Sequence, residues 1–349
     1  MTFRGAVARL IPLDHRAAAD ATALHDRLAK PRGALGRLEE VGVRLAAIAG
    51  ACPPPVPEPA VVAVFAGDHG VLVEGVTPWP QEVTAQMVAA FCAGGAAVNV
   101  LARHAGAQVV VVDVGVASDL PPAPGLLLRK VRHGTANLAA GPAMTVEEAA
   151  RALDVGAAVA AGAAADGARC LVTGDMGIGN TTASAALIAA FTGRAAEEVT
   201  GRGTGVDDPT WRRKIRVVEA AVARAPDTGP LDILAALGGL EIAALAGFIV
   251  GGAAARVPVV VDGVVALAGL LVAAALAPAC VGHCLAGHRS TEPGATAVLG
   301  HLGLEPLLDL GMRLGEGTGA CLALPLVQAA AKVLREMATL DSAGVTGKD

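Results

Sequence analysis

A glycine-rich segment between an apolar run and a helix-forming run constrains this chain most. Gly174–Thr181 has the spacing G-x-x-x-x-G-N-T, which is that of an ATP-binding P-loop with Asn180 in place of the lysine. Cys170–Val172 precedes it as an apolar run, and Thr182–Phe191 follows as a helix-forming run. A strand, a glycine loop and a helix N-terminus in this order can hold a phosphate. Without the lysine, the segment favours a lone phosphate, as on a mononucleotide; the alternative is a tight turn whose glycines serve packing alone.

Apolar runs rich in valine alternate along the chain with longer alanine-rich helical segments. The runs predicted as strands are 60–66, 108–114, 126–131, 169–173, 257–261 and a short one near 279–284. Continuous apolar strands are typical of sheets covered on both faces, and the intervening segments are long enough for crossover helices. The sequence therefore predicts an α/β fold with a doubly wound, mostly parallel sheet.

A proline-rich linker at 51–59 separates an N-terminal helical piece from the first predicted strand. Beyond His288 the pattern becomes helical again, so the two ends of the chain are expected to pack together. We predict a small helical domain from residues 1–55 and 285–340, and an α/β domain from residues 56–284. Residues 341–349 are predicted to be a disordered tail.

The composition limits the function classes. Of 349 residues, 54% are hydrophobic and 17% charged, so the chain can bury a large core. The net charge of -5 offers no basic field for nucleic acid, and without tyrosine and with little Phe or Trp the chain has few residues to stack on bases. We therefore expect no nucleic-acid partner.

The cysteines are scattered and lie mostly in apolar runs, which favours reduced thiols in a cytoplasmic protein. Cys280, His283, Cys284 and His288 could be considered a zinc cluster, but their surroundings are apolar and no CxxC occurs. We expect no metal site, with structural zinc as the alternative.

One uncharged stretch, Gly263–Gly282, could be taken for a membrane span. Pro278 interrupts it, and it lacks flanking Lys or Arg residues and aromatic anchors. A buried helix followed by a strand fits it better, and we expect no membrane partner; a small membrane protein is the alternative.

Glycines follow several predicted strands, at Gly67–Val71, Asp113–Val116 and Asp262–Gly263. Open α/β sheets bind ligands at the carboxyl ends of their strands, so a cleft along that edge is implied. Asp68 and His69 could form a catalytic pair there, but we favour a polar pair that orders a neighbouring loop.

A second glycine run, Gly201–Gly205, precedes a basic cluster formed by Arg212, Arg213, Lys214 and Arg216. Asp207 or Asp208 with Pro209 predicts a helix start, which places Lys214 about two turns in. Lys214 could reach back to a phosphate or lie in solvent, and most of the cluster is expected to be solvated.

Glu316 stands between glycines ahead of an apolar helical run. A carboxylate with open backbone on both sides and apolar neighbours can approach a flat ligand and can have a raised pKa. The alternative is a polar residue that starts a helix.

Together these segments resemble the nicotinate-nucleotide dimethylbenzimidazole phosphoribosyltransferase family, which makes the lower-ligand nucleotide of cobalamin. The resemblance covers about residues 5 to 338. Its motifs are Lys30–Glu39 (KPRGALGRLE), Ala66–Val71 (AGDHGV), Gly94–Asn99 (GGAAVN), the Gly174–Thr182 loop, Gly287–Gly294 (GHRSTEPG) and Leu314–Ala320 (LGEGTGA). Several long motifs in order are far more specific than one glycine loop.

The resemblance implies transfer of phosphoribose from nicotinate mononucleotide to a benzimidazole nitrogen, with release of nicotinate and inversion at C1′. The donor carries no pyrophosphate, so neither Mg²⁺ nor a cofactor is expected, in agreement with the missing P-loop lysine. The partners are then the nucleotide and a benzimidazole-type base, and the family precedent is a homodimer. A non-catalytic nucleotide-binding or sensor protein on the same fold is the alternative.

The resemblance also implies roles for individual residues. The catalytic residues are Glu316, as general base, and Asp175. Those expected to bind the phosphate and nucleotide are Gly177, Ile178, Gly179, Asn180, Thr181, Gly203, Lys214 and Ser290. Those expected to bind the base are Trp79, Gln86, Met176, Leu314 and Gly315. Two positions depart from the family pattern: Asp175 stands where Glu is familiar, and Trp79 stands where smaller residues are usual.

Overall fold

The computed structural model describes residues 1–345, which contain one six-stranded sheet in the order β3-β2-β1-β4-β5-β6. All neighbouring strands are parallel. The strands are β1 (Ala60–Gly67), β2 (Ala107–Gly115), β3 (Leu126–Leu128), β4 (Cys170–Met176), β5 (Val259–Val261) and β6 (Cys284–Ala286). The order reverses between β1 and β4, as in doubly wound sheets, which confirms the predicted fold class.

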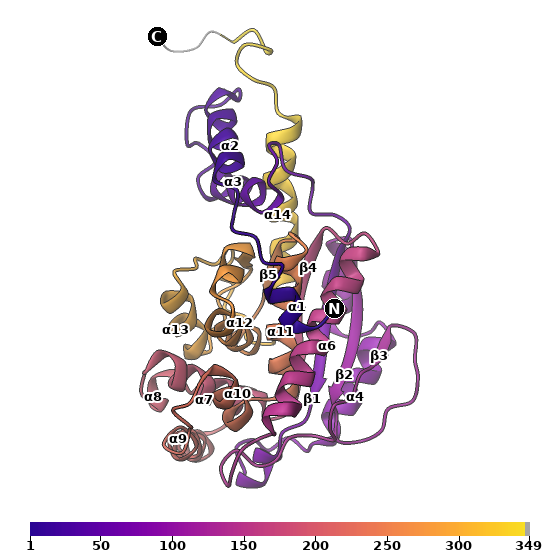
Figure 1. Ribbon diagram of the computed structural model, residues 1–349, viewed down its shortest axis with the longest axis vertical. Helices are drawn as coiled ribbons and strands as arrows, with labels where there is room; N and C mark the ends of the chain where they lie inside the picture. Colours follow the sequence, from indigo (N-terminus) through magenta and orange to yellow (C-terminus); the bar gives the residue numbers. More distant parts are fainter. Residues whose placement is uncertain (346–349) are drawn as a thin grey trace.

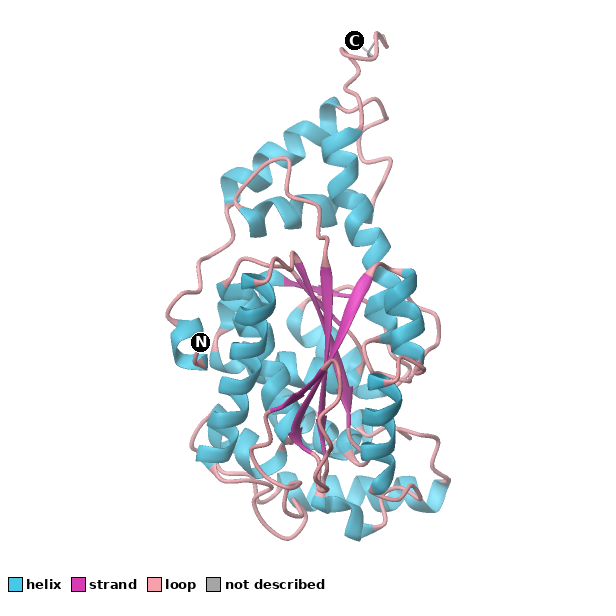
Figure 2. Ribbon diagram, turned by 90° about the vertical axis from the view of Figure 1, so that its right-hand side faces the viewer, coloured by secondary structure: helices cyan, strands magenta, loops and turns pink. Residues whose placement is uncertain are grey.

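Helices cover the sheet on both sides (Figure 2). Up to β4 they are α1 (Phe3–Val7), α2 (His15–Arg27), α3 (Arg37–Ala49), the 3₁₀ helix η1 (Gly70–Glu74), α4 (Glu82–Cys92), α5 (Ala97–His104) and α6 (Val146–Ala165). After β4 they are α7 (Asn180–Thr192), α8 (Ala196–Val199), α9 (Asp208–Val222), α10 (Pro230–Leu237), α11 (Leu240–Ala254), α12 (Val264–Leu276), the 3₁₀ helix η2 (Pro278–His283), α13 (Pro293–Leu302) and α14 (Thr318–Glu336).

The two faces of the sheet bury different sets of side chains. Along β1, Ala63 and Phe65 join the core formed with α6, α7, α11 and α12. Val62 and Val64 join the core formed with α4, α5 and α14. This alternation follows from the two-residue period of a strand, and burial on both faces explains why the strands are continuous apolar runs.

Alanine and glycine allow the helices to approach one another closely. A Cβ on Gly156 of α6 would collide with the carbonyl oxygen of Ala244 in α11. Small apolar residues therefore account for the close packing of these helices over the sheet.

The sequence-based boundaries fail near β6. The predicted strand at 279–284 is the 3₁₀ helix η2, and the strand runs over Cys284–Ala286. Pro278 explains the shift, because proline fits the first turn of a helix and lacks the N–H that a strand would donate. The stretch that resembled a membrane span contains α12, whose residues Val264–Ala273 are buried.

A different segment, Glu82–His104, is long and apolar enough to cross a membrane by length and composition alone, and 33% of its apolar 18-residue window is buried. It consists of two helices, α4 and α5, separated by a turn at residues 93–96. Val88 of α4 and Val98 of α5 pack against the sheet, so this segment forms part of the folded core.

The helices α2 and α3 and the end of α14 lie together beyond one end of the sheet (Figure 1). Ala21, Ala46 and Leu334 form their shared core. Within the expected range 285–340, β6 belongs to the sheet, α13 packs on α7 and α12, and the first half of α14 packs on the sheet. The division at residues 55 and 285 stays a prediction. Of the predicted tail, residues 341–345 form a turn, and residues 346–349 lie outside the described part.

Candidate active site

A cavity of about 370 Å³ lies at the carboxyl ends of β4, β5 and β6. It brings together most of the residues expected to act: Trp79, Asp175, Met176, Gly177, Ile178, Asn180, Thr181, Gly203, Ser290, Leu314, Gly315 and Glu316. This is the edge at which open parallel sheets bind their ligands. Gln86, Gly179 and Lys214 do not line it.

The glycine loop after β4 turns directly into α7, as the sequence predicted. A Cβ on Gly177 would collide with the carbonyl oxygen of Gly67 at the end of β1, so only glycine fits there. The N–H of Ile178 donates to Thr84 Oγ1 at 3.1 Å, which fixes the loop from α4. The N-terminus of α7 therefore faces the cavity with Asn180 and Thr181 at its mouth, a geometry suited to an anion.

Lys214 lies buried behind this helix N-terminus and is not in solvent. Its Nζ donates to Thr181 Oγ1 at 2.7 Å, and its side chain leaves α9 toward Gly203. Burial lowers the pKa of Lys214 to about 8, and the carboxylate of Glu292 opposes that shift. Arg213, the preceding residue, is exposed and donates to the carbonyl oxygen of Gly75 at 3.1 Å. Only one cation of the basic cluster therefore reaches the loop, within the part of the chain the structure describes.

Glu292 holds the second glycine run in place. Its Oε1 accepts the N–H of Gly203 at 2.8 Å, and its own N–H donates to Ser290 Oγ at 3.3 Å. Arg313 Nη1 donates to the carbonyl oxygen of Gly203 at 2.8 Å from the other side. These contacts hold the loop at 201–205 against the N-terminus of α7, beside Thr181 and Lys214.

Glu316 stands in a left-handed turn at the cavity wall, with φ 63° and only 6% of its surface exposed. A left-handed φ is uncommon for a residue other than glycine and occurs often at functional sites. Burial, and then the negative charge of Asp262, raise the pKa of Glu316 to about 7. Its Oε2 has no hydrogen-bond partner among the described residues, so the carboxylate can take a proton from a ligand.

Asp175 faces the same turn from the end of β4. Its carboxyl accepts one hydrogen bond, from Asn180 Nδ2 at 3.1 Å, and lies against Gly315. Burial, and then the charges of Asp262, Glu241 and Glu316, raise the pKa of Asp175 well above its ordinary value. The two carboxyl groups differ in their surroundings, since Asp175 accepts a hydrogen bond from Asn180, whereas the pKa of Glu316 lies near neutral pH.

The opposite wall of the cavity is apolar. Val83 and Met87, one turn apart on α4, line it together with Met176 and Leu314, and Trp79 is half exposed at its rim. Gln86 lies on a neighbouring face of α4 and lines a separate groove near Leu120 and Pro121. Its assignment to the base site therefore finds no support in this cavity.

Asp68 and His69 order loops, as the sequence favoured. Asp68 Oδ2 accepts the N–H of Ala117 at 2.8 Å, after β2. His69 Nε2 and Glu241 Oε1 lie 2.6 Å apart, fully buried. Burial disfavours the charged imidazole, but the facing Glu241 carboxylate more than offsets this and raises the pKa of His69.

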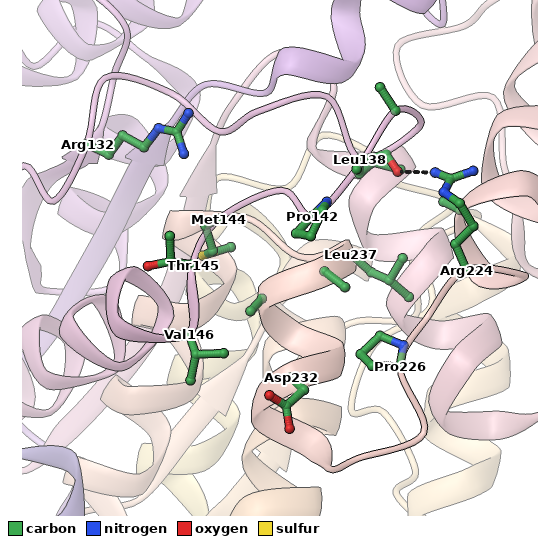
Figure 3. Close-up of a pocket in the computed structure, with 15 residues that line it drawn as sticks. Arg132, Leu138, Pro142, Met144, Thr145, Val146, Arg224, Pro226, Asp232 and Leu237 are labelled. Atoms are coloured by element: carbon green, nitrogen blue, oxygen red, sulfur yellow. Dashed lines mark hydrogen bonds between the residues drawn. The ribbon is translucent and has the colours of Figure 1, made fainter.

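A second cavity, of about 560 Å³, lies elsewhere, between the start of α6 and helices α9 and α10 (Figure 3). Arg224 already donates to the carbonyl oxygens of Leu138 and Ala139, at 2.8 and 2.6 Å. Arg132 Nη1 lies 3.3 Å from Glu148 Oε2. Since both guanidinium groups are engaged, this larger cavity offers less for a phosphate than the one at the sheet edge.

Comparison with known proteins decides the family. A family profile described as Phosphoribosyltransferase matches residues 10–345. The nicotinate-nucleotide–dimethylbenzimidazole phosphoribosyltransferase of Salinispora tropica is 57% identical over 364 aligned positions, which cover 100% of both chains. The chain belongs to this family. The enzyme of the same name from Chloroflexus aurantiacus is 57% identical over 97% of this chain and 96% of its own. The crystal structure of the Thermus thermophilus member has a TM-score of 0.92 and 52% identity, covering 96% of this chain and 100% of its own.

Three residues outside the expected set belong to the cavity of this phosphoribosyltransferase or support it. Glu292 and Arg313 line it, and Asp262 lies directly behind Glu316. The signals were present, because Glu292 is inside the GHRSTEPG motif, Arg313 precedes Leu314, and Asp262 follows a strand. What was missing was the fold that brings these segments together.

The described residues do not form a cluster of metal ligands. Within residues 1–345, no group of three or more His, Cys, Asp or Glu side chains is arranged to hold a metal ion. Cys280 and Cys284 are buried in the core, and burial raises the pKa of each thiol, to about 12 for Cys280. Across the described residues, the cysteines are free thiols.

Proposed function

We propose that this chain transfers phosphoribose from nicotinate mononucleotide to 5,6-dimethylbenzimidazole or a related base. The products are nicotinate and the α-ribotide, α-ribazole 5′-phosphate, used to assemble the nucleotide loop of cobalamin. Membership of the family supports this proposal. The observation that carries it is one cavity with an anion-binding helix end at one side and Glu316 at the other.

The phosphate is proposed to bind at the start of α7, at the Gly177–Thr181 loop. The N–H groups of Ile178 and Asn180 already donate to Thr84 Oγ1 and to the carbonyl oxygen of Gly177, so the remaining N–H groups of the loop are proposed to face the phosphate. Gly203 and Ser290 close this end of the cavity, and Lys214 supplies the positive charge through its place behind Thr181. Lys214 does not line the cavity in this structure, so its contact with phosphate requires Nζ to leave or share Thr181 Oγ1. A lysine whose burial has lowered its pKa gains from an anion, which restores the charged form.

The base is proposed to lie against the apolar wall formed by Val83, Met87, Met176 and Leu314, with Trp79 at the rim. One ring nitrogen then attacks C1′ of the donor on the face opposite nicotinate. The bond from C1′ to the pyridinium nitrogen breaks, and its electron pair stays on that nitrogen, which departs neutral. Glu316 takes the proton from the other benzimidazole nitrogen.

This chemistry assigns separate tasks to the two carboxyl groups. Glu316, with a pKa of about 7, can take a proton near neutral pH and supports positive charge on the ribosyl ring. Asp175, whose pKa is raised by burial and by the neighbouring carboxylates, holds Asn180 and lies against the turn at Gly315. No cofactor is required, since the donor brings its own leaving group.

A product assay tests the function. The purified chain is mixed with nicotinate mononucleotide and, separately, 5,6-dimethylbenzimidazole, benzimidazole, adenine and a phenol. Nicotinate and ribotide are measured by chromatography and mass spectrometry. We expect base-dependent release of nicotinate in equal amount to ribotide. Binding of the nucleotide without nicotinate release from any base would indicate a sensor protein instead.

Three further properties are proposals. We propose that the protein is cytoplasmic, which the free cysteines support. We propose a homodimer, which light scattering coupled to size-exclusion chromatography tests. We also propose that α2, α3 and the end of α14 behave as a small helical domain, supported by their own core of Ala21, Ala46 and Leu334.

A further inference from the structure

We propose that Asp262 is a positioning residue for the catalytic base, because it ties the turn that carries Glu316 to the ends of β4 and β5. This inference rests on the proposed function, in which Glu316 takes the proton. Asp262 does not line the cavity and is 2% exposed, so it acts through Glu316 and not on the substrates.

The hydrogen bonds of Asp262 join three elements. Its Oδ2 accepts the N–H of Gly317 at 3.0 Å, and its Oδ1 accepts the N–H of Ala320 at 3.1 Å, both at the start of α14. Its own N–H donates to Thr173 Oγ1 of β4 at 3.0 Å. One buried carboxylate therefore binds the N-terminus of a 19-residue helix to two adjacent strands.

This attachment acts on the residue directly before Gly317. Glu316 has a left-handed backbone, which persists only where the surroundings fix it. Its carbonyl lies against β4 so closely that a Cβ on Gly174 would be 2.5 Å from the oxygen. Thr318 Oγ1 donates to the carbonyl oxygen of Gly315 at 2.7 Å and closes the turn. Asp262 thus holds one side of the turn while β4 limits the other.

Asp262 also sets the charge around the base. Burial raises the pKa of Asp262 itself to about 6, which is below that of Glu316, so Asp262 is ionised where Glu316 titrates. After burial, this negative charge is the cause that raises the pKa of Glu316. The other ionisable groups near this pair are Asp175 on β4, Cys321 on α14, His288 after β6, Glu241 on α11 and Arg313 at the cavity. A base with a higher pKa accepts a proton more readily, so the same carboxylate that positions Glu316 also strengthens it.

Asp262→Asn is the main test, because asparagine also caps helix N-termini but carries no charge. We expect kcat to fall roughly 10- to 100-fold through loss of alignment and basicity. The KM for nicotinate mononucleotide should stay near that of the wild type. The acid limb of the pH profile of kcat/KM should move to lower pH, because removing a neighbouring negative charge lowers the pKa of Glu316.

Two further variants separate position from charge. Thr173→Val removes the acceptor for the Asp262 N–H but keeps the carboxylate, so kcat should fall while the acid limb stays in place. Asp14→Asn is the control, because Asp14 caps the N-terminus of α2, where its Oδ1 accepts the N–H of Ala17 at 2.9 Å. This variant should change neither kcat nor the acid limb.

The outcomes are decisive in each direction. Wild-type kcat in Asp262→Asn, or a fall in kcat with an unmoved acid limb, would overturn the proposal. Should Asp262→Asn fail to give a cooperative melt, wild-type kcat in Thr173→Val would overturn it.

A readout independent of activity separates this proposal from the proposed function. The titration of Glu316 is followed in the full chain by carboxyl ¹³C NMR, with its signal identified by its loss in Glu316→Gln. If the wild type releases no nicotinate, the function fails, and an unshifted titration in Asp262→Asn would still refute the coupling on its own.

Discussion

Lys214 Nζ donates a 2.7 Å hydrogen bond to Thr181 Oγ1, which joins a buried cation on α9 to the N-terminus of α7. The P-loop pattern would place a lysine at position 180, within the loop itself. Here the cation comes from a different helix, and Asn180 instead binds the neighbouring carboxyl of Asp175. The loop thereby gains a positive charge while its own polar residue serves the catalytic side of the cavity.

Replacing this lysine should weaken donor binding alone. Lys214→Met is expected to raise the KM for nicotinate mononucleotide about 10- to 100-fold, because a hydrogen bond to a charged group contributes roughly 1.5–3 kcal/mol. The KM for the base should change little. Arg213→Met is the matched control, since Arg213 is exposed and contacts Gly75. Small, equal effects of both substitutions in initial-rate kinetics would mean that backbone N–H groups alone hold the phosphate.

Glu316→Gln should lower turnover by at least about 100-fold, since general-base catalysis contributes roughly 10²–10⁴ in rate. Binding of nicotinate mononucleotide, measured by calorimetry, should persist. Because the base acts only when ionised, wild-type kcat/KM should decrease as the pH is lowered below about 7, the pKa of Glu316. That limb should be absent from the residual activity of the variant. Near-normal turnover in a folded variant would remove Glu316 from the mechanism.

The same substitution should affect stability in a pH-dependent way. The pKa of Glu316 is about 7 in the folded state against an ordinary value of 4.5, so the folded state favours the protonated carboxyl. Ionisation therefore penalises folding increasingly as pH rises from about 4.5 to 7. The melting temperature of Glu316→Gln should therefore exceed that of the wild type at pH 8, and the difference should be smaller at pH 5. Calorimetric melts at the two pH values check this, and an equal difference at both would contradict it.

Activity should survive treatment with EDTA. The proposed donor contains no pyrophosphate whose charge a divalent ion must neutralise, and its nicotinate leaves with a neutral ring nitrogen. Rates before and after dialysis against EDTA should agree. Activity that is lost and returns only with Mg²⁺ would indicate a pyrophosphate-bearing donor.

Trp79 should influence which base is used. Trp79→Ser is expected to raise the KM for 5,6-dimethylbenzimidazole roughly 2- to 10-fold, because an aromatic contact contributes about 0.5–1.5 kcal/mol. The KM for the donor should not change. Gln86→Ala serves as the control, since Gln86 lies on α4, the helix that follows the Trp79 loop, and lines a separate groove. A larger effect from Gln86→Ala than from Trp79→Ser would place Gln86 in the base site after all.

Local sequence was sufficient for the doubly wound parallel sheet and for the loop between β4 and α7. Continuous valine runs, glycines after strands and the cap at Asp207 are signals that act over a few residues. Where a local signal competes with another, as at Pro278, the predicted strand near 279–284 was wrong. The family motifs in the sequence also indicate Glu316, Asp175 and Lys214 as candidate site residues.

Only the tertiary structure decided how those residues act. The raised pKa of Glu316 comes from burial and from Asp262, which is 54 positions away in the chain (316 − 262). Lys214 lies behind α7 because α9 packs there, whereas Arg213 beside it faces solvent. Gln86 and Met87 are adjacent in sequence, yet only Met87 lines the cavity. Burial and charge proximity depend on segments that are distant in the chain, so no local pattern determines them.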